Sequence, residues 1–243
     1  MITPDPLGPP PALAARSEWL ESLRRLSGGI AHHLRNALTV ILGRLQLLST
    51  SSLPADVRAS LDVIAEQSKR IDRLVTSLSR FARRAEPNRG HHSLNDVVEE
   101  TLGLARSEME LRGVEPTLAL DPKAPVVHAD RQQLEEALLS LFMNAIEAMP
   151  RGGRLSVTTA SAADGRMVAI TTTDTGVGIP ADAIEKIFDP FFSTKAGATG
   201  LGLTVVQSIV EAHGGTIEIS SRVGEGTTVR LTWPVAMAAP APS

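Results

Sequence analysis

The chain has 243 residues, 42% of them hydrophobic and 21% charged, so it can bury a core and is not disordered throughout. It contains no Cys, which excludes disulfides, thiolate metal sites and cysteine nucleophiles. No uncharged apolar run approaches the roughly 18 residues that a membrane span requires. Because Met1–Pro11 is rich in Pro and lacks the basic and apolar regions of a signal peptide, a cytoplasmic protein is expected.

Charge divides the chain into two modules. Residues 16–89 carry 13 Lys and Arg against 7 Asp and Glu, whereas residues 90–243 carry 11 against 19. A basic half can indicate nucleic-acid binding, but these charges are spread along helical repeats without interleaved aromatic residues, so no nucleic-acid partner is expected. We expect disordered tails at 1–16 and 236–243, a helical domain at 17–88 and a mixed α+β domain at 89–235.

Two long amphipathic helices are predicted at 17–49 and 55–85, joined through Ser49–Pro54. Each carries an apolar stripe with steps of three and four residues. The stripes consist of Leu26, Ile30, Leu34, Leu38, Ile41, Leu45 and Leu48, and of Val57, Leu61, Ile64, Ser68, Ile71, Val75, Leu78 and Ala82. An isolated hairpin cannot cover both stripes, so we expect a homodimer in which two hairpins form a four-helix bundle.

His32 falls on the face of the first helix opposite its stripe, with Asn36 one turn further along that face and His33 on the flank. An exposed helical His is by itself most often a surface residue. The surrounding segment, Ser27-Gly-Gly-Ile-Ala-His-His-Leu-Arg-Asn-Ala-Leu, resembles the H-box of the histidine kinases. The resemblance implies that His32 is the phosphoacceptor and that His33 and Asn36 belong to its catalytic neighbourhood.

This H-box departs from the family pattern at two positions. Ala37 replaces a common Pro, which only removes a kink. His33 stands where the family has an acid that serves as general base and is implicated in phosphatase activity. A neutral imidazole can accept a proton near pH 7; alternatively the step is slow or uses another base.

A different pattern begins near Ser93. Helices are predicted at 94–111, 131–149, 181–188 and 201–212, and strands at 114–120, 126–128, 154–161, 167–173, 216–220 and 227–233. Strands that precede, separate and follow helices indicate a layered α/β sandwich.

Polar and Gly-rich segments in this half suit a nucleotide. Asn144 lies among apolar neighbours on a helix, where an amide needs a partner or a ligand. Asp174 follows a strand, and Gly176 and Gly178 allow the backbone to approach a flat base. The segment Phe188-Asp-Pro-Phe-Phe-Ser-Thr-Lys precedes Gly200-Leu-Gly202, which opens a helix where backbone N–H groups favour phosphate.

These four segments, in this order, are similar to the N, G1, F and G2 boxes of the GHKL-type catalytic domain of histidine kinases, and Gly224-Glu-Gly-Thr-Thr matches that family's last hairpin. The resemblance implies ATP and Mg²⁺ as cofactors, with Asn144 holding the metal and Asp174 binding the adenine amino group. Residues 189–202 would be an ATP lid, with contacts from Thr194, Lys195, Gly200, Leu201 and Gly202. A Walker A motif is absent, which excludes P-loop binding.

The resemblance also implies partners: the receiver domain of a response regulator, docked on Leu26–Leu48 and the start of the second helix. The signal would arrive through residues 1–20 or through a separate sensor protein. Two other functions stay open. An ATP hydrolase of the gyrase, MutL and Hsp90 type would need a Glu where this chain has Ser140. A non-catalytic dimeric scaffold is favoured by His33 and disfavoured by the intact nucleotide boxes.

Overall fold

The computed structural model describes residues 11–49, 53–82, 86–162, 164–195 and 198–236, with the backbone alone at 11–26, 73 and 80. The chain divides into two compact units, Met1–Arg84 and Ala85–Ser243. The expected tail segments 1–10 and 237–243 lie outside the described residues, as does the side chain of Leu26 in the predicted stripe.

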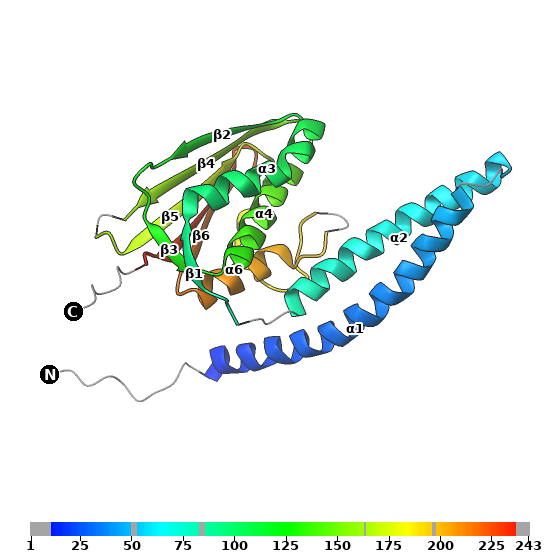
Figure 1. Cartoon of the computed structure of the whole chain (residues 1–243), viewed down its shortest axis with the longest axis horizontal. Helices are drawn as coiled ribbons and strands as arrows, with labels where there is room; N and C mark the ends of the chain where they lie inside the picture. The colour runs from blue at the N-terminus through cyan, green and yellow to red at the C-terminus, as the bar shows by residue number, and fades with distance from the viewer. Residues whose placement is uncertain (1–10, 50–52, 83–85, 163, 196–197, 237–243) are drawn as a thin grey trace. The chain divides into compact units, whose positions relative to one another are not determined.

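The N-terminal unit is a hairpin of two helices, α1 (Pro11–Ser49) and α2 (Ala55–Ala82), which run side by side (Figure 1). Helix α1 begins earlier than expected, because Pro is well tolerated in the first turn of a helix. Ala31 and Leu38 of α1 are buried against Val75 of α2. The Arg35 guanidinium donates a hydrogen bond of 2.8 Å to the Ser79 hydroxyl and so adds a polar link between the helices.

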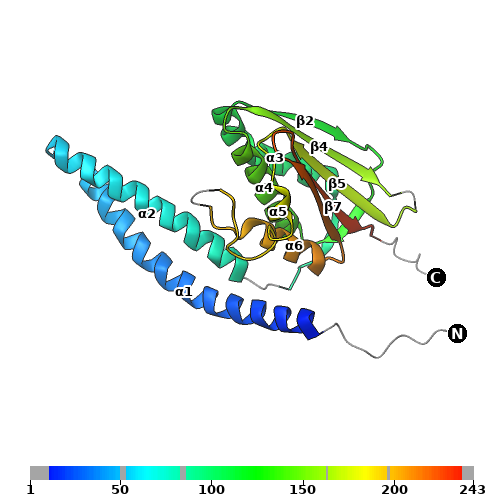
Figure 2. The same ribbon diagram turned by 180° about the vertical axis from the view of Figure 1, so that it is seen from behind.

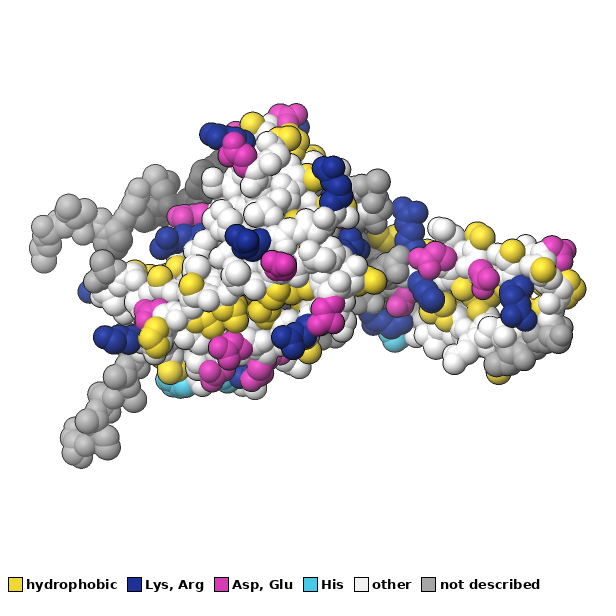
Figure 3. Space-filling view, turned by 90° about the horizontal axis from the view of Figure 1, so that it is seen from above, with side chains coloured by type: hydrophobic (Ala, Val, Ile, Leu, Met, Phe, Trp, Pro, Cys, Tyr) yellow, Lys and Arg dark blue, Asp and Glu magenta, His cyan; other side chains and the backbone are white. Residues whose placement is uncertain are grey.

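The hairpin by itself leaves about half of its two apolar stripes exposed. The exposed members are Ile30, Leu34, Ile41 and Leu48 on α1, and Val57, Ile64 and Ile71 on α2. The exposed fraction reaches 53% at Ile30 and 48% at Ile64, and Figure 3 shows apolar side chains among charged ones along the hairpin. A row of exposed aliphatic residues at heptad spacing is a surface that another helix can cover.

The C-terminal unit contains a five-stranded sheet in the order β2-β4-β5-β7-β6. Its strands are β2 (Val114–Leu120), β4 (Gly153–Ser161), β5 (Met167–Asp174), β6 (Thr216–Arg222) and β7 (Gly226–Pro234). Strand β2 runs parallel to β4, and the other neighbours are antiparallel. Helices α3 (Leu94–Arg112), α4 (Arg131–Ala148) and α6 (Gly202–Ala212) cover one face of the sheet (Figures 1 and 2). The predicted α+β class is confirmed.

The core lies between α4 and the sheet. Leu134, Leu138 and Phe142 of α4 are fully buried, together with Leu155 of β4 and Ile170 of β5. Both long helices here begin at a side-chain cap: the Ser93 hydroxyl accepts from the Asp96 N–H, and Asp130 Oδ1 accepts from the Gln133 N–H. Such caps satisfy N–H groups that a first turn otherwise leaves unpaired.

Two short elements differ from the prediction. Strand β1 (Gly90–Ser93) was not expected; it pairs antiparallel with β3 (Val126–Ala129) in a separate two-stranded sheet. Its four residues include two His and carry no apolar alternation, so the sequence alone gives no strand signal. Helix α5 covers only Ala181–Ile184, and turns replace the predicted helix up to Phe188, just before Asp189–Pro190.

We expect Leu138→Ala to lower the free energy of unfolding of the C-terminal unit by about 2–5 kcal/mol, because it leaves a cavity under α4. Leu118 of β2 is 43% exposed, so Leu118→Ala is the matched control and should cost less than about 1 kcal/mol. The measurement is urea unfolding followed by Trp233 fluorescence in a Trp19→Phe background. Equal losses for the two variants would contradict the assigned core.

Candidate functional site

Three segments that are distant in sequence converge on the C-terminal turns of α4. At Gly202, the first residue of α6, an added Cβ would lie 3.1 Å from Ser140 Oγ and 3.4 Å from Asn144 Nδ2. The Lys195 ammonium donates a hydrogen bond of 2.9 Å to the Asn144 carbonyl oxygen. The Val177 N–H donates one of 3.0 Å to the Ala148 carbonyl oxygen. All four nucleotide boxes predicted from the sequence therefore meet at one end of one helix.

Asn144 is half-buried, and its side-chain amide makes no hydrogen bond within the described part of the chain. Among those residues, no group of three or more His, Asp and Glu is arranged to hold a metal ion. Mg²⁺ is commonly held by one or two protein ligands together with phosphate oxygens and water. A single free amide oxygen beside a helix N-terminus therefore fits a cation that arrives with a nucleotide.

Asp174 ends β5 and is only 7% exposed. Its Oδ1 accepts hydrogen bonds from the Gly176 N–H at 2.8 Å and from the Thr227 N–H at 3.3 Å. Burial raises the pKa of this carboxyl, although the two N–H donors and the positive charge of Lys195 oppose the shift. Oδ2 accepts no hydrogen bond from a described residue, so it can accept one from an incoming amino group.

The loop after Asp174 is held tightly on both sides. A Cβ at Gly176 would lie 2.6 Å from the Ala148 carbonyl oxygen, so a side chain does not fit there. Gly178 has a φ of 72°, in the left-handed region that Gly adopts readily. The β6–β7 hairpin supports the loop through the Ser221 hydroxyl, which accepts from the Ile179 N–H at 2.8 Å. This rigid support fixes the position of the Asp174 carboxylate.

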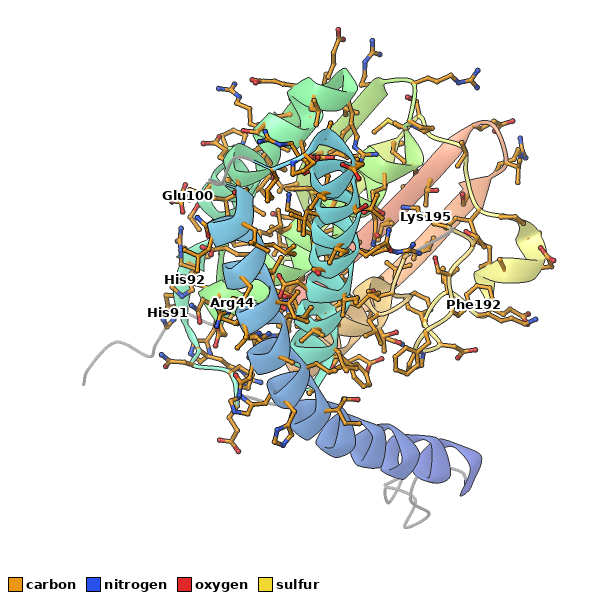
Figure 4. All side chains as sticks on the ribbon, turned by 90° about the vertical axis from the view of Figure 1, so that its right-hand side faces the viewer. Arg44, His91, His92, Glu100, Phe192 and Lys195 are labelled. Atoms are coloured by element: carbon orange, nitrogen blue, oxygen red, sulfur yellow. The ribbon has the colours of Figure 1, made fainter. Side chains whose placement is uncertain are left out.

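The segment expected to be a lid follows α5, and residues 196–197 within it lie outside the described residues. Lys195 projects from this segment (Figure 4) and bonds to Glu147 Oε2 at 3.1 Å as well as to the Asn144 carbonyl. Thr194 is exposed. The Gly200 carbonyl accepts a hydrogen bond from the Phe191 N–H at 3.1 Å, while the Leu201 side chain is buried at the start of α6.

His32 is exposed on α1, as predicted, and so are His33 and Asn36. The Asn36 amide nitrogen lies 3.4 Å from His32 Nε2. The rings of His32 and His33 are arranged edge to face, with their centroids 6.0 Å apart. Both imidazoles are therefore accessible, and the Asn36 amide lies beside the first.

Sequence reasoning missed two residues that shape the site. Glu147 forms the ion pair with Lys195, and Thr227 supplies the second N–H donor to Asp174. The sequence gives one weak indication of Glu147: it lies three residues after Asn144 and thus on a neighbouring helix surface. Thr227 lies in the Gly224-Glu-Gly-Thr-Thr segment, but that signal does not reveal its partner, since only the pairing of β7 with β5 brings it to Asp174.

Two family models match the chain. The model described as "His Kinase A (phospho-acceptor) domain" matches residues 22–87. The one described as "Histidine kinase-, DNA gyrase B-, and HSP90-like ATPase" matches residues 129–237. The two matches correspond to the helical hairpin and to most of the sandwich.

Curated relatives include the sensor histidine kinase ZraS of Klebsiella oxytoca, which is 37% identical over 91% of this chain and 48% of its own length. The chain spans about half the length of the curated relatives it matches. None of the described helices is both long and apolar enough to cross a membrane.

Solved structures that resemble this one include those of ShkA and of the histidine kinase ThkA. Full-length ShkA in complex with AMPPNP aligns with a TM-score of 0.75 at 26% identity, over 88% of this chain and 46% of that one. The catalytic domain of ThkA aligns with a TM-score of 0.56 at 30% identity, over 61% of this chain and 96% of that one. ThkA in complex with the response regulator protein TrrA aligns with a TM-score of 0.66 at 25% identity, over 91% and 64%. The chain therefore belongs to the histidine kinase family of two-component systems.

Proposed function

We propose that this chain binds ATP through Asn144, Asp174 and the segment around Gly202, phosphorylates itself on His32, and passes the phosphoryl group to an aspartate of a response regulator. The observation that carries the proposal is the convergence of the four boxes on α4, with a buried carboxylate and a free amide oxygen. The match of the hairpin to phosphoacceptor domains supports His32 as the acceptor.

Each site residue has a distinct role in this reaction. Asp174 Oδ2 accepts from the adenine amino group, and the N-terminal end of α6 at Gly202 faces the phosphates with unpaired N–H groups. Thr194, Lys195, Gly200 and Leu201 belong to the segment that closes over them. Asn144 would hold Mg²⁺, which neutralises triphosphate charge when bound.

The transfer step is an in-line displacement. An imidazole nitrogen of His32 attacks the γ-phosphorus of ATP; the N–P bond forms while the bond to the β,γ-bridging oxygen breaks, and ADP leaves. The imidazole proton passes to a base, for which His33 is the nearest candidate on α1. Asn36 holds the attacking ring through its amide.

A homodimer is the second part of the proposal. The uncovered heptad stripes of α1 and α2 would be buried when two hairpins form a four-helix bundle. The helical surface near His32 would then dock a receiver domain, and ThkA, a kinase of similar fold, is seen in complex with such a regulator. A chain that consumes ATP is expected to work in the cytoplasm, with its signal supplied by a separate sensor protein or by further segments.

The presence of Ser at position 140 argues against the ATP-hydrolase alternative. This side chain lies beside Gly202, where a water-activating carboxylate would be needed, and Ser is a poor base. Glu147, two turns further along α4, is paired with Lys195. A non-catalytic scaffold would not require the Asp174 and Asn144 geometry.

Incubation with Mg²⁺ and ATP labelled on the γ-phosphate should label the wild-type chain, and His32→Gln should abolish the label. The label should be lost in acid and stable in alkali, as expected for phosphohistidine. His91→Gln is the matched control, because it makes the same change at an exposed His that has no proposed role in the transfer. A label that persists in His32→Gln would contradict the assignment of the acceptor.

Asp174→Asn should weaken ATP binding by roughly 10- to 150-fold, the equivalent of about 1.5–3 kcal/mol for a hydrogen bond to a charged acceptor. The amide oxygen can still accept from Gly176 and Thr227, so the fold should persist and circular dichroism should be unchanged. The measurement is isothermal titration with ATP and Mg²⁺. Asp182→Asn, in the exposed first turn of α5, is the control; equal affinities for the two variants would exclude Asp174 from the site.

Glu147→Gln should raise ATP affinity by roughly 1.5- to 5-fold, because it releases Lys195 from a pair worth about 0.2–1 kcal/mol and removes a negative charge near the phosphates. The gain should shrink at high ionic strength, which screens such exposed charges. Glu135→Gln on the same helix, where Glu135 pairs with Arg131, is the control. A fall in affinity would show instead that Glu147 contributes directly to binding.

A further inference from the structure

A buried histidine joins α4 and α6 at the ends of these helices that lie away from the nucleotide boxes. His213 follows α6 and is 6% exposed. Its Nδ1 lies 2.8 Å from the Ile209 carbonyl oxygen, and its Nε2 lies 3.0 Å from the Asp130 N–H. A carbonyl can only accept and an N–H can only donate, so Nδ1 carries the proton and Nε2 is the acceptor. Only the neutral ring satisfies both partners.

Asp130, whose N–H donates to His213, is the N-cap of α4, and both of its carboxylate oxygens accept hydrogen bonds. Oδ1 accepts from the Gln133 N–H at 3.1 Å, and Oδ2 accepts from the Asn88 N–H at 2.8 Å. The neighbouring Arg89 donates a hydrogen bond of 2.6 Å to the Ala212 carbonyl at the end of α6. The segment by which the chain enters the C-terminal unit is thus bonded to the ends of both helices.

Helices α4 and α6 run antiparallel, because Asp130 and His213 meet at one end while Asn144 and Gly202 meet at the other. The eleven residues of α6 separate these two points by roughly 16 Å. The helices belong to one apolar core. Apolar contacts are non-directional, whereas a hydrogen bond loses strength steeply with distance and angle, so the hydrogen bond is the sharper constraint on axial position. The contact at His213 therefore sets the axial register of α6 on α4.

We infer that His213 is a positioning residue for the nucleotide site: by accepting from the Asp130 N–H it fixes α6 on α4 and so holds Gly202 opposite Asn144. The inference rests on the proposed binding of ATP at those two residues. Its consequence is that the segment Asn88–Arg89, which bonds to the same helix ends, is mechanically connected to the phosphate end of the site.

The charge state of His213 controls this contact. Burial lowers the pKa of His213, and the Arg89 and His128 charges act in the same direction, against Asp130 and the Ile209 carbonyl. The ring is therefore neutral at neutral pH. Protonation on acidification below pH 6.5 would turn Nε2 into a donor facing another donor, and the register contact would be lost.

The test compares His213→Leu, which fills the space without an acceptor, and His213→Gln, whose amide oxygen can replace Nε2, in the full chain. Leu102→Ala on α3 is the matched control, because Leu102 is buried in the same core on a helix other than α4 and α6. Binding of ATP with Mg²⁺ is measured by titration at a temperature at which all variants are folded. Amide hydrogen exchange at Asp130 is measured in the same samples.

We expect His213→Leu to raise the Kd roughly tenfold, the scale set by a buried N–H left unpaired, with faster exchange at Asp130. His213→Gln and Leu102→Ala should stay within about threefold of the wild type. Equal affinity of His213→Leu and Leu102→Ala would overturn the inference, whereas a wild type that binds no ATP would overturn the proposed function instead.

The pH dependence of ATP affinity distinguishes a positioning role of His213 from a purely stabilising one. The ratio of wild-type to His213→Gln affinity should be constant above pH 6.5 and should fall on acidification, because only the wild type has a titrating ring there. Titration of the nucleotide and of Asp174 affects both proteins equally and cancels in the ratio. A ratio that stays flat through the pH range in which the His213 ring protonates, followed by NMR of the wild type, would overturn the inference, even if His213→Leu fails to fold.

Discussion

The burial of α4 against the sheet is the constraint on which the rest of the C-terminal unit depends. Its inward face is fully apolar, so its axis and rotation are fixed by packing. That fixed rotation decides where the polar residues of its last turns point, and the backbone carbonyls of Asn144 and Ala148 become anchor points for two loops. A single well-packed helix thereby organises the metal, base and phosphate ends of the proposed nucleotide site.

The proposed site combines rigid and adaptable parts. Asp174 is held by two backbone N–H groups and by a loop that packs on α4 and on the β6–β7 hairpin. Lys195, by contrast, is anchored by an exposed ion pair, which is a weak interaction in water. The adenine end is thus pre-organised at folding, whereas the phosphate end can rearrange when a charged ligand arrives.

The helical hairpin differs from the C-terminal unit in how its apolar side chains are covered. Few of its apolar residues are buried within one chain, and much of its stripe is exposed at heptad positions. Its stability as a hairpin is therefore tied to a second helical surface, and His32, the proposed acceptor, lies on the face that such pairing leaves in solvent. A phosphoryl group on this exposed helix would be accessible to another protein, as the proposed transfer requires.

The sequence by itself determined the α+β class, the bounds of most helices and strands, and the residues at the proposed site, because hydrophobic periodicity and Gly-rich turns are local signals. It did not determine strand β1, whose polar residues become a strand only by pairing with β3. Nor did it give the partners of Lys195, Asp174 and His213, namely Glu147, Thr227 and Asp130. Tertiary structure decided these contacts, because each joins residues that are distant in sequence. They meet only when α4 packs against α6 and the Lys195 segment, or when β7 pairs with β5.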